Sequence, residues 1–145
     1  MRKILIALSL LVLLLTPTAF GKASAPGISR EVHCLAENIY HEARGESFKG
    51  KLAVAVVTLN RTKKEEYPRS ICGVVYQKGQ FSWTAKRQKI TDWADYTDAL
   101  LAANMAIENS NILGNFRATH YHNLTVAPAW GLRKVAKIGN HVFYS

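Results

Sequence analysis

Apolar residues between positions 29 and 43 recur at helical spacing, which predicts an amphipathic helix facing a core. The apolar stripe consists of Val32, Leu35, Ala36, Ile39 and Ala43. Glu42 flanks this stripe in the last turn, whereas Glu37 and His41 are expected on the opposite face. Gly45 then provides a stop, because glycine adopts the left-handed conformation of a helix C-terminus without steric cost.

A second helix is predicted over residues 47–61, where the chain is apolar on nearly every side. Taken alone, this stretch fits a buried strand or a buried helix. Its length and its alanines favour a central helix that begins near Ser47. Residues 62–67 are charged and predict a solvated turn, after which Pro68 can open a short helix over residues 68–76.

A fourth helix is predicted over residues 91–108, with Thr91 as its cap. Its expected inward side consists of Trp93, Tyr96, Leu100, Asn104 and Ile107. We interpret residues 80–83 before this helix and residues 109–115 after it as loops.

The last third of the chain changes to a strand-like period. Residues 116–121 have extended character, and the segments 136–138 and 141–144 flank Gly139-Asn140 as in a hairpin with a two-residue turn. With the helices, this small β element predicts a mainly helical α+β domain over residues 29–145.

The first 23 residues have the order of a secretory signal peptide: a basic start, an apolar run and then small residues. We expect cleavage between residues 19 and 25, after Ala19, Gly21 or Ala23. The apolar run is about a dozen residues long, shorter than the roughly 20 of a spanning helix, so we expect no stable membrane anchor after processing. The protein is predicted to be exported to the periplasm, the cell wall or the extracellular space.

About 120 residues remain, which is enough for one compact domain, and we expect a monomer. Removing Arg2 and Lys3 from the 19 basic residues leaves 17 against 10 acidic residues, a net charge near +7. A basic surface on an exported protein suits an anionic cell envelope, whereas export disfavours nucleic acid as a partner.

The two cysteines, Cys34 and Cys72, are even in number in a chain bound for an oxidising compartment. We therefore predict a disulfide between them, which would join the first helix to the segment after Pro68. The alternative is two buried free thiols.

Glu42 is the candidate for acid catalysis. A carboxyl group in the last turn of a helix, at the edge between core and cleft, is partly desolvated. Desolvation raises the pKa of a carboxyl group and keeps a share of it protonated near neutral pH, as a general acid requires. The alternative role for Glu42 is a surface salt bridge with Arg44 or Lys49.

Four separated motifs favour the catalytic interpretation. They are Cys34-Leu35-Ala36 with the following Glu42-Ala43-Arg44-Gly45-Glu46, then Leu59-Asn60-Arg61, Gln80-Phe81-Ser82-Trp83-Thr84, and Ile138-Gly139-Asn140-His141-Val142-Phe143-Tyr144. From about Glu31 to Tyr144, the chain resembles the SleB-type cell wall hydrolase family. The resemblance implies a lysozyme-like fold and an enzyme that cuts peptidoglycan glycan, with Glu42 as the catalytic acid. It leaves open whether Asn60 and Arg61 support the floor of the active site or cap their helix.

Residues Gln80, Phe81, Ser82 and Trp83 combine aromatic rings with amide and hydroxyl groups, a mixture that suits sugar binding. Alternatively, Phe81 and Trp83 belong to the core, and we expect this of at least one of them. The acidic-Gly turn that family members often carry after this motif is replaced by Ala85-Lys86-Arg87, which indicates a changed rim of the cleft.

The stretch from Thr119 to Asn123 is similar to an aromatic-histidine segment of the family. We expect His120, Tyr121 and His122, together with Trp130, to form the far wall of the cleft and contact substrate. Glu46 is expected to pair with Arg44 or to orient the cleft. The other acidic residues fall on solvated turns or helix surfaces, so we find no second carboxylate placed as a nucleophile.

A single acid favours a lytic transglycosylase that cleaves between N-acetylmuramic acid and N-acetylglucosamine, since hydrolases usually need two carboxylates. No cofactor or metal is expected. An N-acetylmuramidase is the alternative within the family. Two rivals come from other classes: a zinc hydrolase, in which His120 and His122 would need His41 or His141 as third ligand, and a noncatalytic glycan-binding module.

Overall fold

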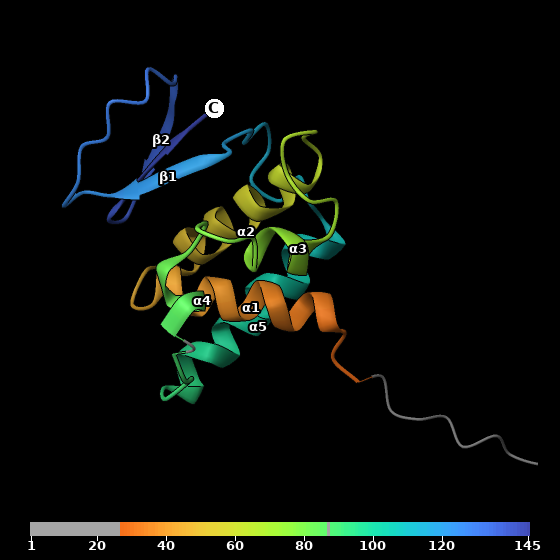
Figure 1. The fold of residues 1–145 in the computed structure, drawn as a ribbon. Helices are drawn as coiled ribbons and strands as arrows, with labels where there is room; N and C mark the ends of the chain where they lie inside the picture. Colours follow the sequence, from red (N-terminus) through yellow and green to blue (C-terminus); the bar gives the residue numbers. More distant parts are fainter. Residues whose placement is uncertain (1–26, 87) are drawn as a thin grey trace, which may run out of the picture.

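The computed structural model describes residues 27–86 and 88–145, and the predicted signal peptide lies outside this range. In the described part, helices form most of the domain and a small sheet follows at its C-terminal end (Figure 1). The elements are α1 (Arg30–Ala43), α2 (Phe48–Thr62), α3 (Ile71–Val75), α4 (Ser82–Lys86), α5 (Trp93–Glu108), β1 (His120–Asn123), β2 (Lys134–Ile138) and β3 (His141–Tyr144). The predicted α+β class is confirmed. Within the described ranges, none of the helices combines the length and apolar character that crossing a bilayer requires.

Helix α1 begins after Ser29, whose hydroxyl accepts a hydrogen bond from the Val32 N–H at 3.3 Å. The helix ends at Ala43, and Gly45 follows with a φ of 76°, the left-handed conformation that the sequence predicts. All five residues of the predicted apolar stripe are buried. Glu42 therefore lies in the last turn of a helix that the core holds along one face.

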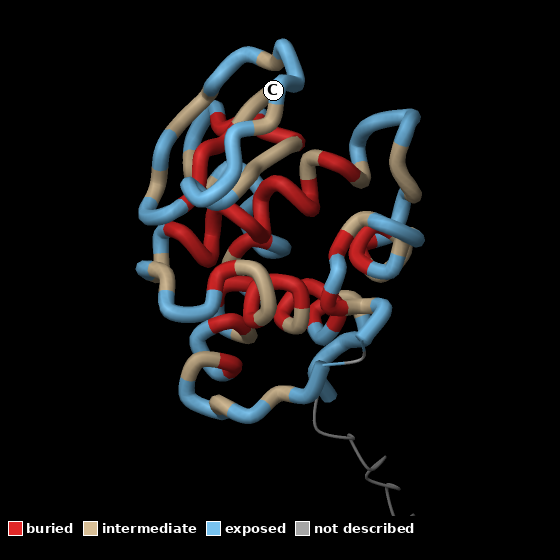
Figure 2. Tube along the Cα trace, turned by 60° about the vertical axis from the view of Figure 1, so that its left-hand side comes forward, coloured by how far each residue is buried: buried red, intermediate tan, exposed pale blue. Residues whose placement is uncertain are grey.

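Helix α2 is buried on nearly every side, and it packs against both α1 and α5 (Figure 2). Ser47 caps its first turn, as predicted. Two buried polar contacts cross its interfaces: Asn38 of α1 donates to the Thr58 hydroxyl at 3.1 Å, and Lys51 Nζ lies 2.6 Å from Asp95 Oδ1 of α5. These contacts fix the positions of α1, α2 and α5 relative to one another.

Helix α5 buries mostly small side chains, and of the predicted inward set only Tyr96 is buried, with Leu100 partly buried against the core. Its buried residues are Tyr96, Ala99, Ala102, Ala103 and Ala106. Of the predicted inward set, Trp93 is 67% exposed, Ile107 is 38% exposed and Asn104 is exposed. Because α5 lies against α1 and α2, the four alanines let the helix backbones approach closely, and Trp93 and Ile107 remain exposed.

Two predicted helix starts were wrong because a side-chain cap lies elsewhere, and one predicted loop is a helix. Helix α5 is capped by Asp92 instead of Thr91, and its carboxylate accepts the Asp95 N–H at 3.1 Å. Helix α3 begins at Ile71 after the cap Ser70, three residues beyond Pro68, because proline offers no side-chain acceptor. Residues from Ser82 form the short helix α4, where a loop was predicted.

The C-terminal sheet has three antiparallel strands in the order β1-β3-β2. The predicted hairpin is present, with Ile138 opposite His141 across Gly139-Asn140. Strand β1 adds to the other edge of β3, with Tyr121 opposite Phe143, so the predicted strand pair is a three-stranded sheet. The sheet carries Tyr121 to the end of α1 where Glu42 lies.

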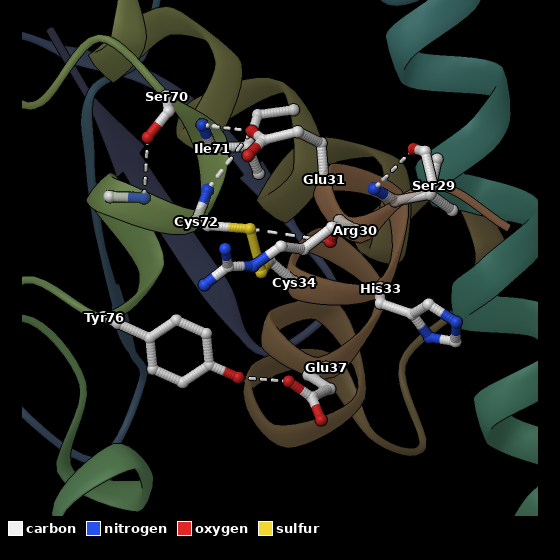
Figure 3. Close-up of a disulfide and its surroundings, with 12 residues drawn as sticks. Ser29, Arg30, Glu31, His33, Cys34, Glu37, Ser70, Ile71, Cys72 and Tyr76 are labelled. Atoms are coloured by element: carbon white, nitrogen blue, oxygen red, sulfur yellow. Dashed lines mark hydrogen bonds between the residues drawn. A yellow bond between two sulfur atoms is a disulfide. The ribbon is translucent and has the colours of Figure 1, made fainter.

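The predicted disulfide between Cys34 and Cys72 is present in the structure and joins α1 to α3 (Figure 3). The Glu31 carboxylate strengthens the same junction, because it accepts the N–H groups of Ile71 at 2.6 Å and Cys72 at 3.3 Å. A carboxylate at the start of a helix satisfies amides that have no partner within the helix. Helix α1 is thus fixed at its first turns, away from Glu42.

Candidate active site

Glu42 faces an open cleft of about 380 Å³. The residues that line it are Glu42, Arg61, Gly79, Gln80, Phe81, Ser82 and Tyr121. They come from the ends of α1 and α2, from residues 79–81 and the first residue of α4, and from β1. Among the lining residues in the described part of the chain, Glu42 is the one carboxylate.

The environment of Glu42 favours its protonated form. Burial raises the pKa of Glu42 above its ordinary value, while a hydrogen bond from Tyr121 and the charge of Arg61 oppose the rise. The Tyr121 hydroxyl donates to Glu42 Oε2 at 3.2 Å. Burial and the neighbouring carboxylate raise the pKa of Tyr121 well above 10, so its phenol keeps its proton and remains a donor.

The salt bridges of the described residues do not include one from Glu42 to Arg44 or Lys49. Arg44 instead lies 4.0 Å from Asp92, on the exposed side of the helix end. The surface salt bridge considered in the sequence analysis is therefore not formed, and the Glu42 carboxylate points into the cleft.

Arg61 forms the floor of the cleft. Its side chain is nearly buried, with Nε donating to the Thr119 carbonyl at 2.7 Å and one terminal nitrogen donating to Gln80 Oε1 at 3.2 Å. Its neighbour Asn60 donates to the carbonyls of Phe116 and Ala118 at 2.9 and 3.0 Å. The two side chains hold the segment before β1 against α2, so the floor-supporting role that the sequence left open is the one the geometry favours.

Three of the four residues predicted between positions 80 and 83 line the cleft: Gln80, Phe81 and Ser82, the last of which begins α4. Trp83 does not line it. Its ring is 6% exposed, stacks on His41 at 4.4 Å between centroids and lies 6.4 Å from Phe81. Phe81 is also 6% exposed, so the expectation that at least one of the two aromatics belongs to the core is met by both.

Strand β1 divides its predicted residues between two faces, because side chains alternate along a strand. Tyr121 points to Glu42, whereas His120 and His122 lie on the other face. There their rings are 5.5 and 5.8 Å from that of Trp130. These three residues form an aromatic cluster that does not line the cleft, in contrast to the far wall that the sequence predicted.

In the described part of the chain, neither His41 nor His141 is grouped with this pair as the third ligand of a zinc site. His141 lies on the Tyr121 face of the sheet, with ring centroids 5.4 Å apart, and His41 is stacked on Trp83. Across residues 27–86 and 88–145, no three His, Cys, Asp or Glu side chains are grouped closely enough to hold a metal ion.

Glu46 holds the hairpin instead of pairing with Arg44. Both of its carboxylate oxygens accept the Asn140 N–H, at 3.3 and 3.2 Å, and Oε1 lies 3.9 Å from His141 Nδ1. Burial lowers the pKa of His141 despite the nearby carboxylate. Glu46 does not line the cleft, so it acts on the site by fixing the position of the β2–β3 turn.

Comparison with known proteins finds one matching family model, "Cell Wall Hydrolase", over residues 45–144. This match begins just after Glu42. Spore cortex-lytic enzymes are similar over most of the chain. That of Bacillus subtilis (strain 168) is 31% identical over 127 residues, covering 83% of this chain and 40% of the relative. That of Oceanobacillus iheyensis is 32% identical over 117 residues, covering 78% and 41%. The chain thus spans about two fifths of the relatives' length.

Two solved structures share the fold. One is described as the catalytic domain of the germination-specific lytic transglycosylase SleB from Bacillus anthracis, with 29% identity and a TM-score of 0.68 over 84% of this chain and all of that one. The other is the catalytic domain of the Bacillus cereus SleB protein, with 28% identity and a TM-score of 0.67 over 87% and 99%. Both solved chains are catalytic domains, so the similarity covers the part of those proteins that carries out the reaction.

Proposed function

Because the chain belongs to the cell wall hydrolase family, we propose that it cleaves the glycan strands of peptidoglycan, with Glu42 as the proton donor. The observation that carries this proposal is the Glu42 carboxyl group in an open cleft, where burial raises its pKa and Tyr121 holds one oxygen. The second carboxyl oxygen of Glu42 can then contact the glycosidic oxygen of the substrate. A positioned acid of this kind contributes roughly 10²–10⁴-fold to a rate.

The bond proposed to break joins N-acetylmuramic acid to N-acetylglucosamine. Glu42 gives its proton to the bridging oxygen, the bond from that oxygen to the anomeric carbon breaks, and the acetamido oxygen of the muramic acid stabilises the positive charge. The 6-hydroxyl of the same sugar then attacks the anomeric carbon and returns its proton to Glu42. Attack within one ring has a high effective concentration, so it competes with water.

The arrangement of carboxylates supports this transglycosylase route over hydrolysis. A retaining or inverting hydrolase usually uses a second carboxylate as nucleophile or as base to water. Glu46 is the nearest candidate in sequence, and its oxygens are occupied by the Asn140 N–H outside the cleft. The substrate's own acetamido and hydroxyl groups can replace that second carboxylate.

The first prediction is that Glu42→Gln loses roughly 10²–10⁴-fold of wall-degrading activity while fold and glycan binding are kept. Glutamine has the shape of glutamate without the transferable proton. Release of soluble fragments from sacculi measures the rate, and circular dichroism checks the fold. Glu37→Gln is the matched control, because Glu37 lies on the same helix and contacts Tyr76, away from the cleft. Full activity in Glu42→Gln would contradict the assignment.

The masses of the products distinguish a lytic transglycosylase from an N-acetylmuramidase. Intramolecular attack leaves 1,6-anhydromuramoyl ends, each one water lighter than a reducing end. A digest that contains reducing muramic acid alone would mean that water is the acceptor and that the protein is an N-acetylmuramidase.

The second prediction is that exhaustive chelation leaves turnover unchanged, because the proposed steps use a side-chain proton and groups of the substrate. The rate of fragment release is measured before and after treatment with a chelator. Activity that disappears and returns with zinc would favour the metal-dependent rival. Binding to sacculi without any release would favour the noncatalytic module.

We also propose that the protein works outside the cytoplasm as an exported monomer, with peptidoglycan as its partner. The basic surface and the signal-like first 23 residues support this proposal. Fractionation of the producing cells and gel filtration of the processed chain test it.

A further inference from the structure

A second hollow lies beside the cleft and is lined by cations. It has a volume of about 300 Å³, and its lining residues are Asn60, Lys63, Lys64, Arg117, Arg133 and Ser145. An adjoining hollow of about 350 Å³ shares Asn60, Lys63 and Arg117 with it. We call the two together the basic pocket. In the described part of the chain, no Asp or Glu side chain lines either hollow.

The cationic side chains of the basic pocket are not paired with acidic side chains of the described residues. Salt bridges among the described residues involve none of its four cationic side chains. Three of these side chains bond neutral oxygens instead: Lys63 to Ser110 Oγ at 3.3 Å, Arg117 to Asn115 Oδ1 at 2.6 Å, and Arg133 to Ser145 Oγ at 3.0 Å. The cations are thus held in position with their charge available for an anion.

The basic pocket and the catalytic cleft share one wall. Asn60 lines the pocket and Arg61 lines the cleft, and consecutive Cα atoms are about 3.8 Å apart. Asn60 bonds the Phe116 and Ala118 carbonyls, and Arg61 bonds that of Thr119, so the segment 116–119 separates the basic pocket from the catalytic cleft. A peptide of four or five residues spans roughly 13–18 Å when extended, so a stem peptide on a sugar in the cleft extends well beyond that sugar.

From this juxtaposition of a catalytic cleft and an uncompensated basic pocket across segment 116–119, we propose that the pocket binds the free carboxylates of the acidic stem peptides on the muramic acid residues of the glycan. The inference rests on the proposed function. Stem peptides are joined covalently to the sugar in the cleft, so their carboxylates reach the pocket at a high effective concentration. Arginine and lysine then bind carboxylates through charge-assisted hydrogen bonds.

The activity test compares peptide-bearing sacculi with glycan strands from which an amidase has removed the stem peptides. In the double variant Lys63→Gln/Arg117→Gln, we expect KM to rise roughly tenfold on peptide-bearing glycan, as loss of charge-assisted bonds implies. KM on peptide-free strands should stay unchanged. The matched control is Arg69→Gln/Lys89→Gln, which removes the same charges from exposed positions outside the pocket.

A binding test separates this inference from the proposed catalysis. An acidic stem tripeptide, L-alanyl-D-isoglutamyl-diaminopimelate, is titrated into the Glu42→Gln protein by calorimetry, so that a wrong catalytic residue would not affect the result. Binding that weakens with added salt and is lost in Lys63→Gln/Arg117→Gln, but kept in Arg69→Gln/Lys89→Gln, supports the proposal. Absence of tripeptide binding would overturn it. So would binding of poly(glycerol phosphate) in its place, since the pocket would then serve phosphodiester polymers.

Discussion

Three influences determine the pKa of the Glu42 carboxyl group: the burial of its side chain, the Tyr121 hydroxyl and the Arg61 charge. Burial raises the pKa of the carboxyl group, and the Tyr121 hydroxyl and the Arg61 charge favour its ionised form. A group that donates a proton and later accepts one must be able to adopt both its protonated and its ionised form near the working pH. In the proposed mechanism, the balance among these influences sets the pH range of activity.

The third prediction follows from the Tyr121 hydrogen bond to Glu42. Because this bond lowers the pKa of Glu42, Tyr121→Phe should raise it. A general acid is active when protonated, so kcat/KM falls as pH rises through that pKa, and in the variant this fall should begin at a higher pH. A pH profile of kcat/KM measures it.

Tyr144→Phe is the control for this profile. Tyr144 bonds His122 on the other face of the sheet. The kcat/KM of Tyr144→Phe should therefore fall over the same alkaline pH range as that of the unaltered protein. A limb in Tyr121→Phe that stays in place or moves to lower pH would show that the hydrogen bond does not tune Glu42.

The sequence predicts some site residues better than others. Glu42 follows from its place beside an apolar stripe and from its motif. The position of Glu46 does not follow from the sequence, because its partner Asn140 lies in a hairpin 94 residues later and no local pattern links the two residues. The outward direction of His120 and His122 depends on the register of β1 with β3, which composition does not reveal.

At the scale of elements, a buried ion pair joins α2 to α5. The Lys51 side chain is 4% exposed and its ammonium lies 2.6 Å from Asp95, with Asp98 at 3.7 Å. Periodicity predicted neither the pair nor the alanine face beside it. Periodicity predicts that large apolar residues form the core, whereas close helix packing favours small ones and leaves Trp93 exposed.

The fourth prediction concerns this pair. Lys51→Met should lower the free energy of unfolding by about 3–5 kcal/mol, because it leaves Asp95 largely buried without its partner. Adding Asp95→Leu should restore most of the loss, since two apolar side chains can replace a buried pair. Urea denaturation measures both. Lys49→Met, on the exposed side of the same helix, is expected within about 0.5 kcal/mol of the starting protein. Equal losses in the single and double variants would contradict the account.

The fifth prediction is that the Cys34–Cys72 bridge forms in the exported protein and stabilises it. Its separation of 38 residues corresponds to about 3–4 kcal/mol from restriction of the unfolded chain. Cys34→Ala/Cys72→Ala should lose up to that amount in denaturation, and reductant should destabilise the original protein but leave the variant unaffected. Non-reducing mass spectrometry should find the original lighter by two hydrogen atoms than its reduced form. Two free thiols in the exported protein would end the proposal.

At the scale of the whole molecule, the cleft lies where the helical part meets the sheet. Helices α1 and α2 contribute Glu42 and Arg61, while β1 contributes Tyr121. The sequence predicts these parts separately, since helical and strand periods are local properties. Their meeting depends on long-range contacts such as those of Asn60 and Arg61 with segment 116–119, which periodicity does not specify.

The direction of α1 has a consequence for immobilising the enzyme on a solid support. The helix begins at Arg30 and carries Glu42 twelve residues later, about 18 Å along its axis. Figure 1 shows its first turn on the side of the molecule away from the sheet. A bead or display scaffold attached ahead of Arg30 would therefore leave the cleft facing the surrounding medium. A fusion after Ser145 would instead begin at the basic pocket, because Ser145 lines it.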